Sequence, residues 1–577
     1  MLSVILIWLY IAVTSFLLGF GVLEGLRGRL YHGKLFFMHA DAYLICGLAT
    51  ATVYAQAFSL FAPVGLGANI LLAGICLLIL LIDRKKLISW LHEIRGQNFT
   101  IIKVFLWFGL ILLYAYGTSR GISHYDTGLY HAQSIRWIET YGVVKGLGNL
   151  HCRLAYNSAS FALSALYSMA FLGGQSYHTC VGFLALILAS VCLEIKNVFL
   201  ERKPRASAFA RVMGFYYLFA VFDEMVSPAS DYFMVLIAFY IVIRWMDLLE
   251  KSEKEIFPYA MLCVLCVFLM TVKLSAALIV LLAIKPASML IRQRKWMETG
   301  IYLTLGIMTA LPYLIRNVIL SGWLIYPFTA IDLFGVDWKI PKEIAYYDER
   351  EIQVYGRGYS DVSRYGISIA EWLPDWFVNL GITEQILIVA AVFSTMVLLV
   401  RIAWKLTHGS RTIQWDSILP EIVLTICFWF WLLSSPLMRY GCVYVYLISA
   451  VIWGDICSER LFPEDDKEVF AQAKDRGIIQ NDIYVSVNTA VLILIGLFLI
   501  YKIAAFGKEL TVFYVNDYWI SQQDYEQFET ESYEIEGIVF YIPREGDRTG
   551  YNSFPSSPVK AQIKLRGDTL KEGFIYE

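Results

Sequence analysis

Apolar stretches of about twenty residues recur along most of this sequence, and they limit the folds that the chain can adopt. A helix of about 20 apolar residues spans the roughly 30 Å hydrocarbon core of a bilayer and satisfies its own backbone hydrogen bonds there. Because 58% of the 577 residues are hydrophobic and only 17% are charged, a water-soluble fold could not cover these stretches with polar surface. The sequence therefore predicts an all-α polytopic membrane protein. Its first stretch, residues 1–23, lacks a signal-peptide pattern and is predicted to be retained.

Basic clusters set the predicted orientation, because short loops rich in Lys and Arg remain in the cytoplasm. Arg27 and Arg29 follow the first span, and the cluster at 84–86 follows the third, which places the segment 119–158 outside. The stretch 159–173 is short and interrupted by Ser, so it is predicted to lie in the external interface as a helix. About fourteen crossings result, with both termini external. The predicted spans are 1–23, 42–62, 66–82, 100–118, 178–198, 206–222, 231–247, 257–272, 274–290, 297–315, 383–404, 418–434, 440–455 and 488–506.

Four regions follow from this topology. They are N-terminal membrane helices (1–99), a membrane core (100–460) with external loops at 119–177 and 316–382, a cytoplasmic connector with the last span (461–506), and an external C-terminal region (507–577). The C-terminal region alternates apolar and polar residues in ELTVFYV, YEIEGIVFYI and AQIKL, a pattern that predicts a small β-containing appendage. The net charge of −2 gives no basic field for nucleic acid, which is not an expected partner.

The densest group of polar and aromatic residues lies in the first external loop, within GISHYDTGLYHAQSIRWIETYGVVKGLGNLHCRLAYNSAS. Apolar residues recur at helical spacing from 127 to 140, and Gly142 is placed to end that predicted helix. Asp126 precedes it, and its carboxylate could cap the helix, act as a general base, or do both. His131, Arg136 and His151 are further candidates for ligand contact, although the spacing of the histidines matches no usual zinc pattern.

A second external cluster, FDEMVSPASDYF, holds Asp223, Glu224 and Asp231 between two spans. Placing charged side chains so close to hydrocarbon costs free energy, and such residues usually have a function. One interpretation is a helix cap at Asp231 with the other two acids solvated. The other is a site for an acceptor hydroxyl or a divalent cation, which prefers oxygen ligands. The sequence leaves both open, and whether a metal is required is unknown.

Three cations are predicted at external span ends, against the usual cytoplasmic bias of Lys and Arg: Lys273, Arg316 and Arg439. Each alone could be an interfacial side chain that reaches toward water. Arg binds phosphate oxygens in a bidentate manner and Lys supplies a compact charge, so the three together favour a phosphate site on the side of Asp126. The later loop, SGWLIYPFTAIDLFGVDWKIPKEIAYYDEREIQVYGRGYSD, is rich in aromatic residues that suit sugar stacking or an interfacial lid.

An acid in the first large external loop, followed by an interfacial helix and a span with a basic end, resembles the C-type glycosyltransferase superfamily, which includes protein mannosyltransferases and lipid A aminoarabinose transferases. The stretch YDTGLYHAQSIRWIETYG…GLGNLHCRLAYNS is similar to a bacterial family of multi-pass membrane proteins related to them. The layout is similar over residues 100–460, while the motif itself is confined to the loop.

This resemblance implies a C-type-like fold in the bacterial inner membrane and a sugar transferred from a polyprenyl-phosphate donor. The acceptor would be an envelope glycan, lipid or protein, and Asp126 would be the catalytic base. The superfamily commonly has a second acid close to the first, whereas this loop offers only Glu139, thirteen residues further on.

The hypothesis is that Lys273, Arg316 and Arg439 hold the donor phosphate while Asp126 deprotonates the acceptor hydroxyl. Three other classes remain open, one of which is a purely structural or assembly protein. A transporter or flippase would place its charges near the membrane midplane, whereas these clusters lie at the external rim. A lipid-linked glycan polymerase or ligase would also have many spans and use external arginines.

Overall fold

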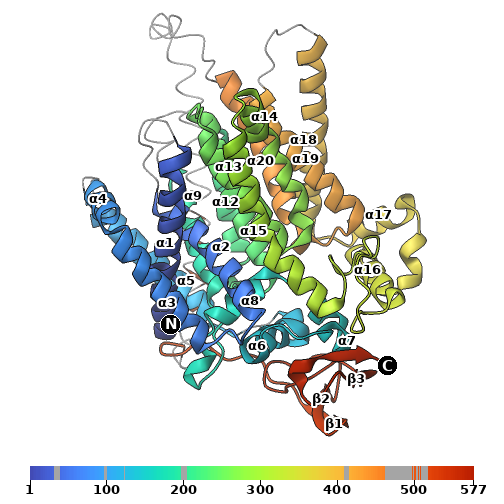
Figure 1. Cartoon of the computed structure of the whole chain (residues 1–577). Helices are drawn as coiled ribbons and strands as arrows, with labels where there is room; N and C mark the ends of the chain where they lie inside the picture. Colours follow the sequence, from blue (N-terminus) through green and yellow to red (C-terminus); the bar gives the residue numbers. More distant parts are fainter. Residues whose placement is uncertain are drawn as a thin grey trace, which may run out of the picture.

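The computed structural model describes residues 1–31, 39–95, 101–121, 124–195, 205–407, 415–461 and 518–577, with a few single positions between 497 and 508. Helices make up the membrane part of the described chain, and short strands appear only in its C-terminal region (Figure 1). The predicted connector and last span, 461–506, lie almost entirely outside the described residues, as do most of the basic cluster at 196–205 and the stretch ELTVFYV.

Eight helices in the described part of the chain are long and apolar enough to cross a bilayer. They are α1 (Leu2–Leu30), α2 (Ala40–Ser59), α12 (Ser230–Glu250), η5 with α14 (Leu274–Ala283 and Ile284–Arg292), α15 (Trp296–Ser321), α18 (Ile382–Thr407), α19 (Trp415–Ser434) and α20 (Met438–Leu461). A ninth crossing is possible if α3 (Leu66–Ile82) and α4 (Arg84–Arg95), which meet at a 78° bend, form one span.

The remaining predicted crossings fall on shorter helices or outside the described residues. The shorter helices are α5 (Ile101–Ser119), α9 (Cys180–Leu193), α11 (Ala206–Ala220) and α13 (Ile256–Val272). The outer helices expose large apolar side chains such as Ile307 of α15 and Val400 of α18. A surface of this kind is unstable in water and suits lipid contact, so the apolar helices indicate a membrane protein.

The helix α8 (Ala159–Leu166) differs from its prediction as an interfacial helix. All its residues are buried, and it packs against α2 and α6 inside the protein. Its eight residues span about 12 Å, too little to cross a bilayer. The prediction of no crossing agrees with this length, but the placement at the lipid surface is wrong, because neighbouring helices cover every face.

Both termini lie at one end of the molecule, together with the first loop (Figure 1). The amide of Leu2 donates to the Trp519 carbonyl at 2.9 Å, and the amide of Ser3 donates to the Ile520 carbonyl at 2.9 Å. The same end holds α6 (Ala132–Tyr141), α7 (Leu147–Leu150) and the C-terminal strands. The central helix, α12, starts at this end and is buried along most of its length.

The predicted β-containing appendage is confirmed. Strands β1 (Thr530–Ile535) and β2 (Ile538–Pro543) pair antiparallel, and β3 (Ile563–Leu565) pairs antiparallel with β4 (Phe574–Tyr576). Glu536 and Gly537 connect β1 to β2, both with positive φ (50° and 85°), as a tight two-residue hairpin turn requires. Phe540 and Phe574 bury their rings with Trp137 of α6, so the appendage is packed onto the first loop.

The other short elements lie mostly at this end or beside it. They are η1 (Thr127–His131), η2 (Cys152–Ala155), η3 (Ala170–Leu172), η4 (Phe222–Glu224), α16 (Lys342–Gly356), η6 (Val362–Gly366), α17 (Ile369–Val378) and η7 (Leu570–Glu572).

Candidate functional site

Four charged side chains from distant parts of the chain meet at the end that carries the first loop. Arg439 Nη2 lies 2.6 Å from Asp126 Oδ2, and Arg439 Nε lies 3.9 Å from Asp231 Oδ2. Lys273 Nζ forms an ion pair with the other oxygen of Asp231. We call Asp126, Asp231, Lys273 and Arg439 the charge cluster. It joins the first loop, the start of α12, the end of α13 and the start of α20.

The charge cluster is partly shielded from solvent but not closed. The side chain of Asp231 is 6% exposed, Asp126 is 14% exposed and Arg439 is 27% exposed. The ring of Tyr440 lies beneath both cations, with its centroid 3.8 Å from Lys273 Nζ and 5.4 Å from Arg439 Cζ. Two carboxylates and two cations balance in charge, and the low local dielectric strengthens each pair. A ligand anion could therefore reach Arg439 while Asp231 still anchors Lys273.

The helix after Asp126 is where its sequence predicts it, but Asp126 does not cap it. The Asp126 side chain makes no capping hydrogen bond, and its carboxylate turns to Arg439 instead. The first turn, η1, is a π-helix, in which the Ala132 amide donates to the Thr127 carbonyl five residues earlier. The chain then continues as α6 and ends at Gly142, whose φ of 80° suits glycine.

The C-terminal region holds this π-turn in place through its backbone. The amides of Thr549 and Gly550 donate to the Gly128 carbonyl at 3.1 and 2.9 Å. In a regular α-helix that carbonyl would accept from the Ala132 amide, which here bonds to Thr127. The residue two positions after Asp126 is thus fixed by a segment more than 400 residues away.

The predicted loop candidate Arg136 serves this docking rather than the charge cluster. It donates to the Tyr551 and Asn552 carbonyls at 2.5 and 2.9 Å, and its guanidinium lies between the rings of Tyr551 and Phe554, 4.9 and 4.6 Å from their centroids. Glu139 accepts from the Tyr551 hydroxyl at 2.5 Å, and burial raises the pKa of this carboxyl. Glu139 therefore belongs to the same contact and is not a partner for Asp126.

Histidines line the charge cluster on the loop side. His124 Nε2 lies 3.3 Å from Arg439 Nη1, and its ring is stacked 5.5 Å from that of His131. Burial lowers the pKa of His124 and lowers that of His131 well below its usual range, which favours neutral rings. The predicted candidate His131 contacts Thr127 Oγ1 at 3.3 Å, whereas His151 lies at the end of α7, where burial lowers its pKa to about 3.

The three predicted acids of the second external cluster are separated. Asp231 joins the charge cluster, Asp223 pairs with Arg120 at 2.6 Å in an exposed position, and Glu224 accepts from the Tyr232 hydroxyl. Within the described ranges, no three His, Cys, Asp or Glu side chains gather in a way that could hold a metal ion. The prediction of these acids as one metal or acceptor site is therefore not supported by their placement.

Arg316 is also placed apart from the other two predicted cations. It is 3% exposed in α15, and it donates to Asn157 Oδ1 at 2.9 Å and to the Ser59 hydroxyl. These contacts tie the loop residue Asn157 to α2 and α15. The structure thus brings Lys273 and Arg439 to Asp126 and leaves Arg316 in a separate buried polar contact.

The structure adds a second polar group, which the sequence had shown only as an aromatic-rich segment. The Tyr156 hydroxyl donates to Asp348 of α16 at 2.8 Å, and Arg153 pairs with Glu351 at 3.9 Å. Asp348 is buried, and burial raises the pKa of its carboxyl to about 6. The Tyr156 ring meets Tyr130 of the π-turn at 5.6 Å, edge to face, so this group adjoins the loop that carries Asp126.

The segment 342–378 packs against the turn that precedes Arg439. The Ser435 hydroxyl donates to the Ile352 carbonyl at 2.9 Å, and the Trp376 indole donates to the Pro436 carbonyl at 2.9 Å. The periodicity of KEIAYYDEREIQVYG indicates an amphipathic helix, but nothing in it identifies Asp348 as the buried acid.

The charge cluster combines cations that can bind a phosphate with a carboxylate that can accept a proton. A family model described as a domain of unknown function (DUF8201) matches residues 1–446 and so ends within α20. No curated protein and no solved structure matches the chain.

Proposed function

The chain belongs to the DUF8201 family, a domain of unknown function, and we propose an activity from its own residues. It transfers a sugar from a polyprenyl-phosphate donor to an envelope glycan, lipid or protein at the outer face of the bacterial inner membrane. The observation that carries this proposal is the charge cluster, in which the Asp126 carboxylate lies 2.6 Å from the Arg439 guanidinium. The proposal includes a C-type glycosyltransferase-like fold, about fourteen crossings and external termini.

Each member of the charge cluster has a part in the proposed reaction. Arg439 and Lys273 hold the donor phosphate and neutralise the charge that develops on it. Asp231 contacts both cations and keeps them in place when the site is empty of substrate. Asp126 accepts the proton of the acceptor hydroxyl.

The proposed reaction forms one bond to the anomeric carbon of the sugar and breaks another. The acceptor oxygen attacks the anomeric carbon and forms the new C–O bond, while the bond from that carbon to the phosphate oxygen breaks. The phosphate leaves with the electron pair and stays paired with Arg439 and Lys273, and the hydroxyl proton moves to Asp126. Attack from the side opposite the leaving group inverts the anomeric centre.

The Asp126–Arg439 pair also implies an order of binding. While Arg439 is 2.6 Å from Asp126, the guanidinium occupies the carboxylate that the proposed reaction uses as its proton acceptor. A phosphate that draws Arg439 to itself weakens that pair and frees the Asp126 carboxylate for the acceptor hydroxyl. The base thus becomes active only when the donor is present, which limits wasteful hydrolysis.

The polar group under α16 supports a place for the acceptor. Arg153, Tyr156 and Asp348 adjoin the loop of Asp126 through the Tyr130–Tyr156 ring contact. Hydroxyl and carboxyl groups of this kind suit the hydroxyls of a sugar or glycan. In the proposal, the acceptor approaches Asp126 from the α16 side and the lipid donor approaches from the bilayer.

The test compares Asp126→Asn with Asp223→Asn, a matched control whose acid lies in an external turn and pairs with Arg120. The gene is deleted, the envelope glycans are compared by mass spectrometry, and each variant is returned. We expect a sugar to be lost on deletion and restored by Asp223→Asn but not by Asp126→Asn. Unchanged glycans after deletion, or full rescue by Asp126→Asn at equal protein level, would overturn the proposal.

A purified protein assay then separates transfer from movement across the membrane. The reconstituted protein receives a labelled polyprenyl-phosphate sugar and an acceptor extract from the deletion strain. Transfer of a single sugar without growth of a preformed chain is expected. Lengthening of a lipid-linked chain would indicate a polymerase, and donor movement between leaflets without transfer would indicate a flippase.

A further inference from the structure

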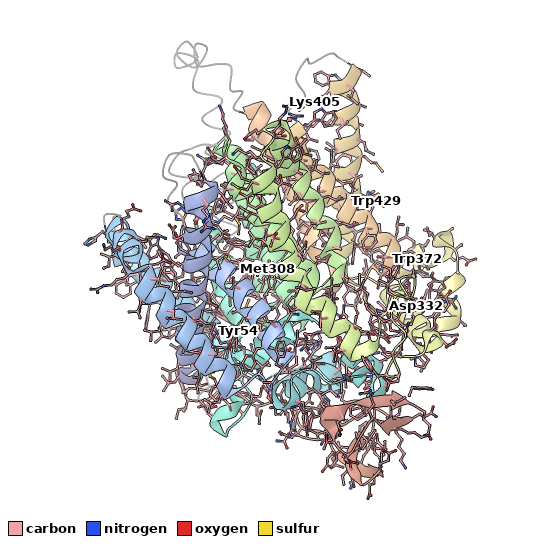
Figure 2. All side chains as sticks on the ribbon, viewed as in Figure 1. Tyr54, Met308, Asp332, Trp372, Lys405 and Trp429 are labelled. Carbon is pink, nitrogen blue, oxygen red and sulfur yellow. The ribbon has the colours of Figure 1, made fainter. Side chains whose placement is uncertain are left out.

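Two arginines of the external segment alternate with three aromatic rings. Arg350 Cζ lies 4.0 Å from the Tyr346 ring centroid and 4.8 Å from that of Tyr365. Arg357 Cζ lies 5.8 Å from the Tyr365 centroid and 5.0 Å from that of Trp372. We call these five residues the arginine–aromatic stack. Trp372 marks its position beside α16 and α17, on the flank of the helical body (Figure 2).

The positive charge of the arginine–aromatic stack has no matching carboxylate. No salt bridge between described residues includes Arg350 or Arg357, and their side chains donate hydrogen bonds to the Tyr346 hydroxyl and the Tyr365 carbonyl. Glu349 acts on Arg350 only from beyond salt-bridge distance, and Glu351, the residue after Arg350, pairs with Arg153. Burial lowers the pKa of Arg357, and no carboxylate opposes this effect.

Hydrogen-bond donors of the arginine–aromatic stack also lack acceptors. The Nε atoms of Arg350 and Arg357 are both buried, and neither has a hydrogen-bond partner among the described residues. A buried N–H without an acceptor loses its hydrogen bonds to water without replacement, and this penalty is larger when the group carries charge. Ring faces stabilise a guanidinium through its plane but accept nothing at its edge. The edges of both arginines are therefore complementary to the oxygens of an anion.

The surroundings place this anion at the level of lipid headgroups. Tyr347, Tyr355, Ile369 and Val378 of the same segment are each more than half exposed. Exposed Tyr beside exposed aliphatic side chains is typical of the membrane–water interface. The segment also packs on the turn before Arg439, which lies in the first turn of α20, at one end of a candidate membrane span.

We propose that the arginine–aromatic stack binds a phosphate group at the membrane interface, in a site distinct from the charge cluster. Planar guanidinium groups bind phosphate oxygens through two parallel hydrogen bonds, and the rings hold both planes in a fixed orientation. The phosphate belongs either to a surrounding phospholipid or to a phosphorylated glycan, which share this chemistry. This proposal does not depend on sugar transfer.

The test measures direct binding by the full chain in a maltoside detergent that contains no phosphate. The probes are a soluble short-chain phosphatidylglycerol and glucose 1-phosphate. The test variant is Arg350→Gln/Arg357→Gln. The control is Arg364→Gln, because Arg364 is also stacked on a ring, Tyr359 at 4.7 Å, but has Asp361 beside it.

We expect at least one probe to bind, with an affinity about tenfold weaker in the double variant and little changed in Arg364→Gln. Binding is also expected to weaken with added salt. Preference for the lipid probe identifies a headgroup, and preference for the sugar phosphate identifies a glycan. Failure of both probes to bind, or equal binding by the double variant, would overturn the proposal.

A second variant tests whether the arginine–aromatic stack has only a structural role. Arg357→Lys keeps the charge and much of the packing but loses the planar double donor. Weaker binding at an unchanged unfolding temperature supports the phosphate site. A lower unfolding temperature with unchanged binding would show that the arginine–aromatic stack only supports the fold, and would refute the proposal.

Discussion

Substitution of Gly128 by alanine tests whether the C-terminal region positions Asp126. A Cβ at this residue would lie 2.8 and 2.9 Å from two ring atoms of Phe528, closer than carbon atoms approach. The ring is not free to move aside, because Arg548 lies 4.6 Å from its centroid and also covers Tyr125 at 4.9 Å. The added methyl therefore pushes the C-terminal region away from the π-turn.

The expected loss of docking free energy in Gly128→Ala follows from the contacts that the added methyl breaks. Overpacking of this kind costs about 1–3 kcal/mol. Loss of the two amide bonds to the Gly128 carbonyl adds about 1–3 kcal/mol, at about 0.5–1.5 kcal/mol each. A total of about 2–6 kcal/mol is large against the stability of a local docking contact, so the docked state becomes a minor one.

Hydrogen–deuterium exchange measures this directly. Gly128→Ala is expected to speed exchange in residues 127–141 and 549–554 by tenfold or more, while the interior of α12 stays protected. If the proposed function holds, the rate of sugar transfer by Gly128→Ala is expected to fall as well. Gly67→Ala is the matched control, because its nearest neighbouring atom is 3.9 Å away, an ordinary contact distance.

Removal of the obstructing ring gives the decisive comparison. Phe528→Ala in the Gly128→Ala background leaves room for the methyl and is expected to restore protection of the π-turn. Unchanged exchange in Gly128→Ala, or no recovery in the double variant, would refute the reasoning that the C-terminal region fixes the turn after Asp126.

Two further predictions concern buried polar groups. Burial raises the pKa of Asp348 from an ordinary 3.8 to about 6, so the folded state binds this proton more tightly than the unfolded state does. The resulting stabilisation of the fold is complete below pH 3.8 and is lost as the pH rises through 6. At 1.36 kcal/mol per pKa unit, the free energy of unfolding changes by about 3 kcal/mol. Protection factors in α16, which are corrected for the intrinsic exchange rate at each pH, should therefore fall between pH 4 and 7, and Asp348→Asn should remove the trend; constant protection factors in the native chain would contradict it. Arg316→Gln is expected to lower the unfolding temperature, because it breaks the buried contacts to Asn157 and Ser59, yet to leave the donor KM near its native value. Lys273→Gln should raise that KM, and a larger KM increase in Arg316→Gln than in Lys273→Gln would place Arg316 at the donor after all.

Much of the arrangement was predictable because it depends on local pattern. Apolar stretches located the long helices, and alternating residues located the β1–β2 hairpin. The positions of Asp126, Lys273 and Arg439 at the ends of such stretches indicated that they could share one face of the membrane part. Their meeting in one cluster was expected, and the distances agree with it.

Other expectations failed because they depend on the direction in which a side chain turns. Arg316 ends an apolar stretch as Arg439 begins one, but packing turns it toward Asn157. Asp223 and Asp231 are eight residues apart, yet one points to Arg120 in solvent and the other starts a buried helix. Spacing along the chain cannot distinguish these cases.

The sequence by itself determined that the chain is built of membrane-crossing helices with a β appendage, because burying apolar residues and satisfying backbone groups in lipid are local requirements. Only the tertiary structure decided which charges meet and what the loop residues do. Arg136 looked like a ligand contact, but its partners, Tyr551 and Asn552, lie more than 400 residues away. The energy of an ion pair or a docking contact depends on distances between atoms, which are fixed only when the whole chain packs.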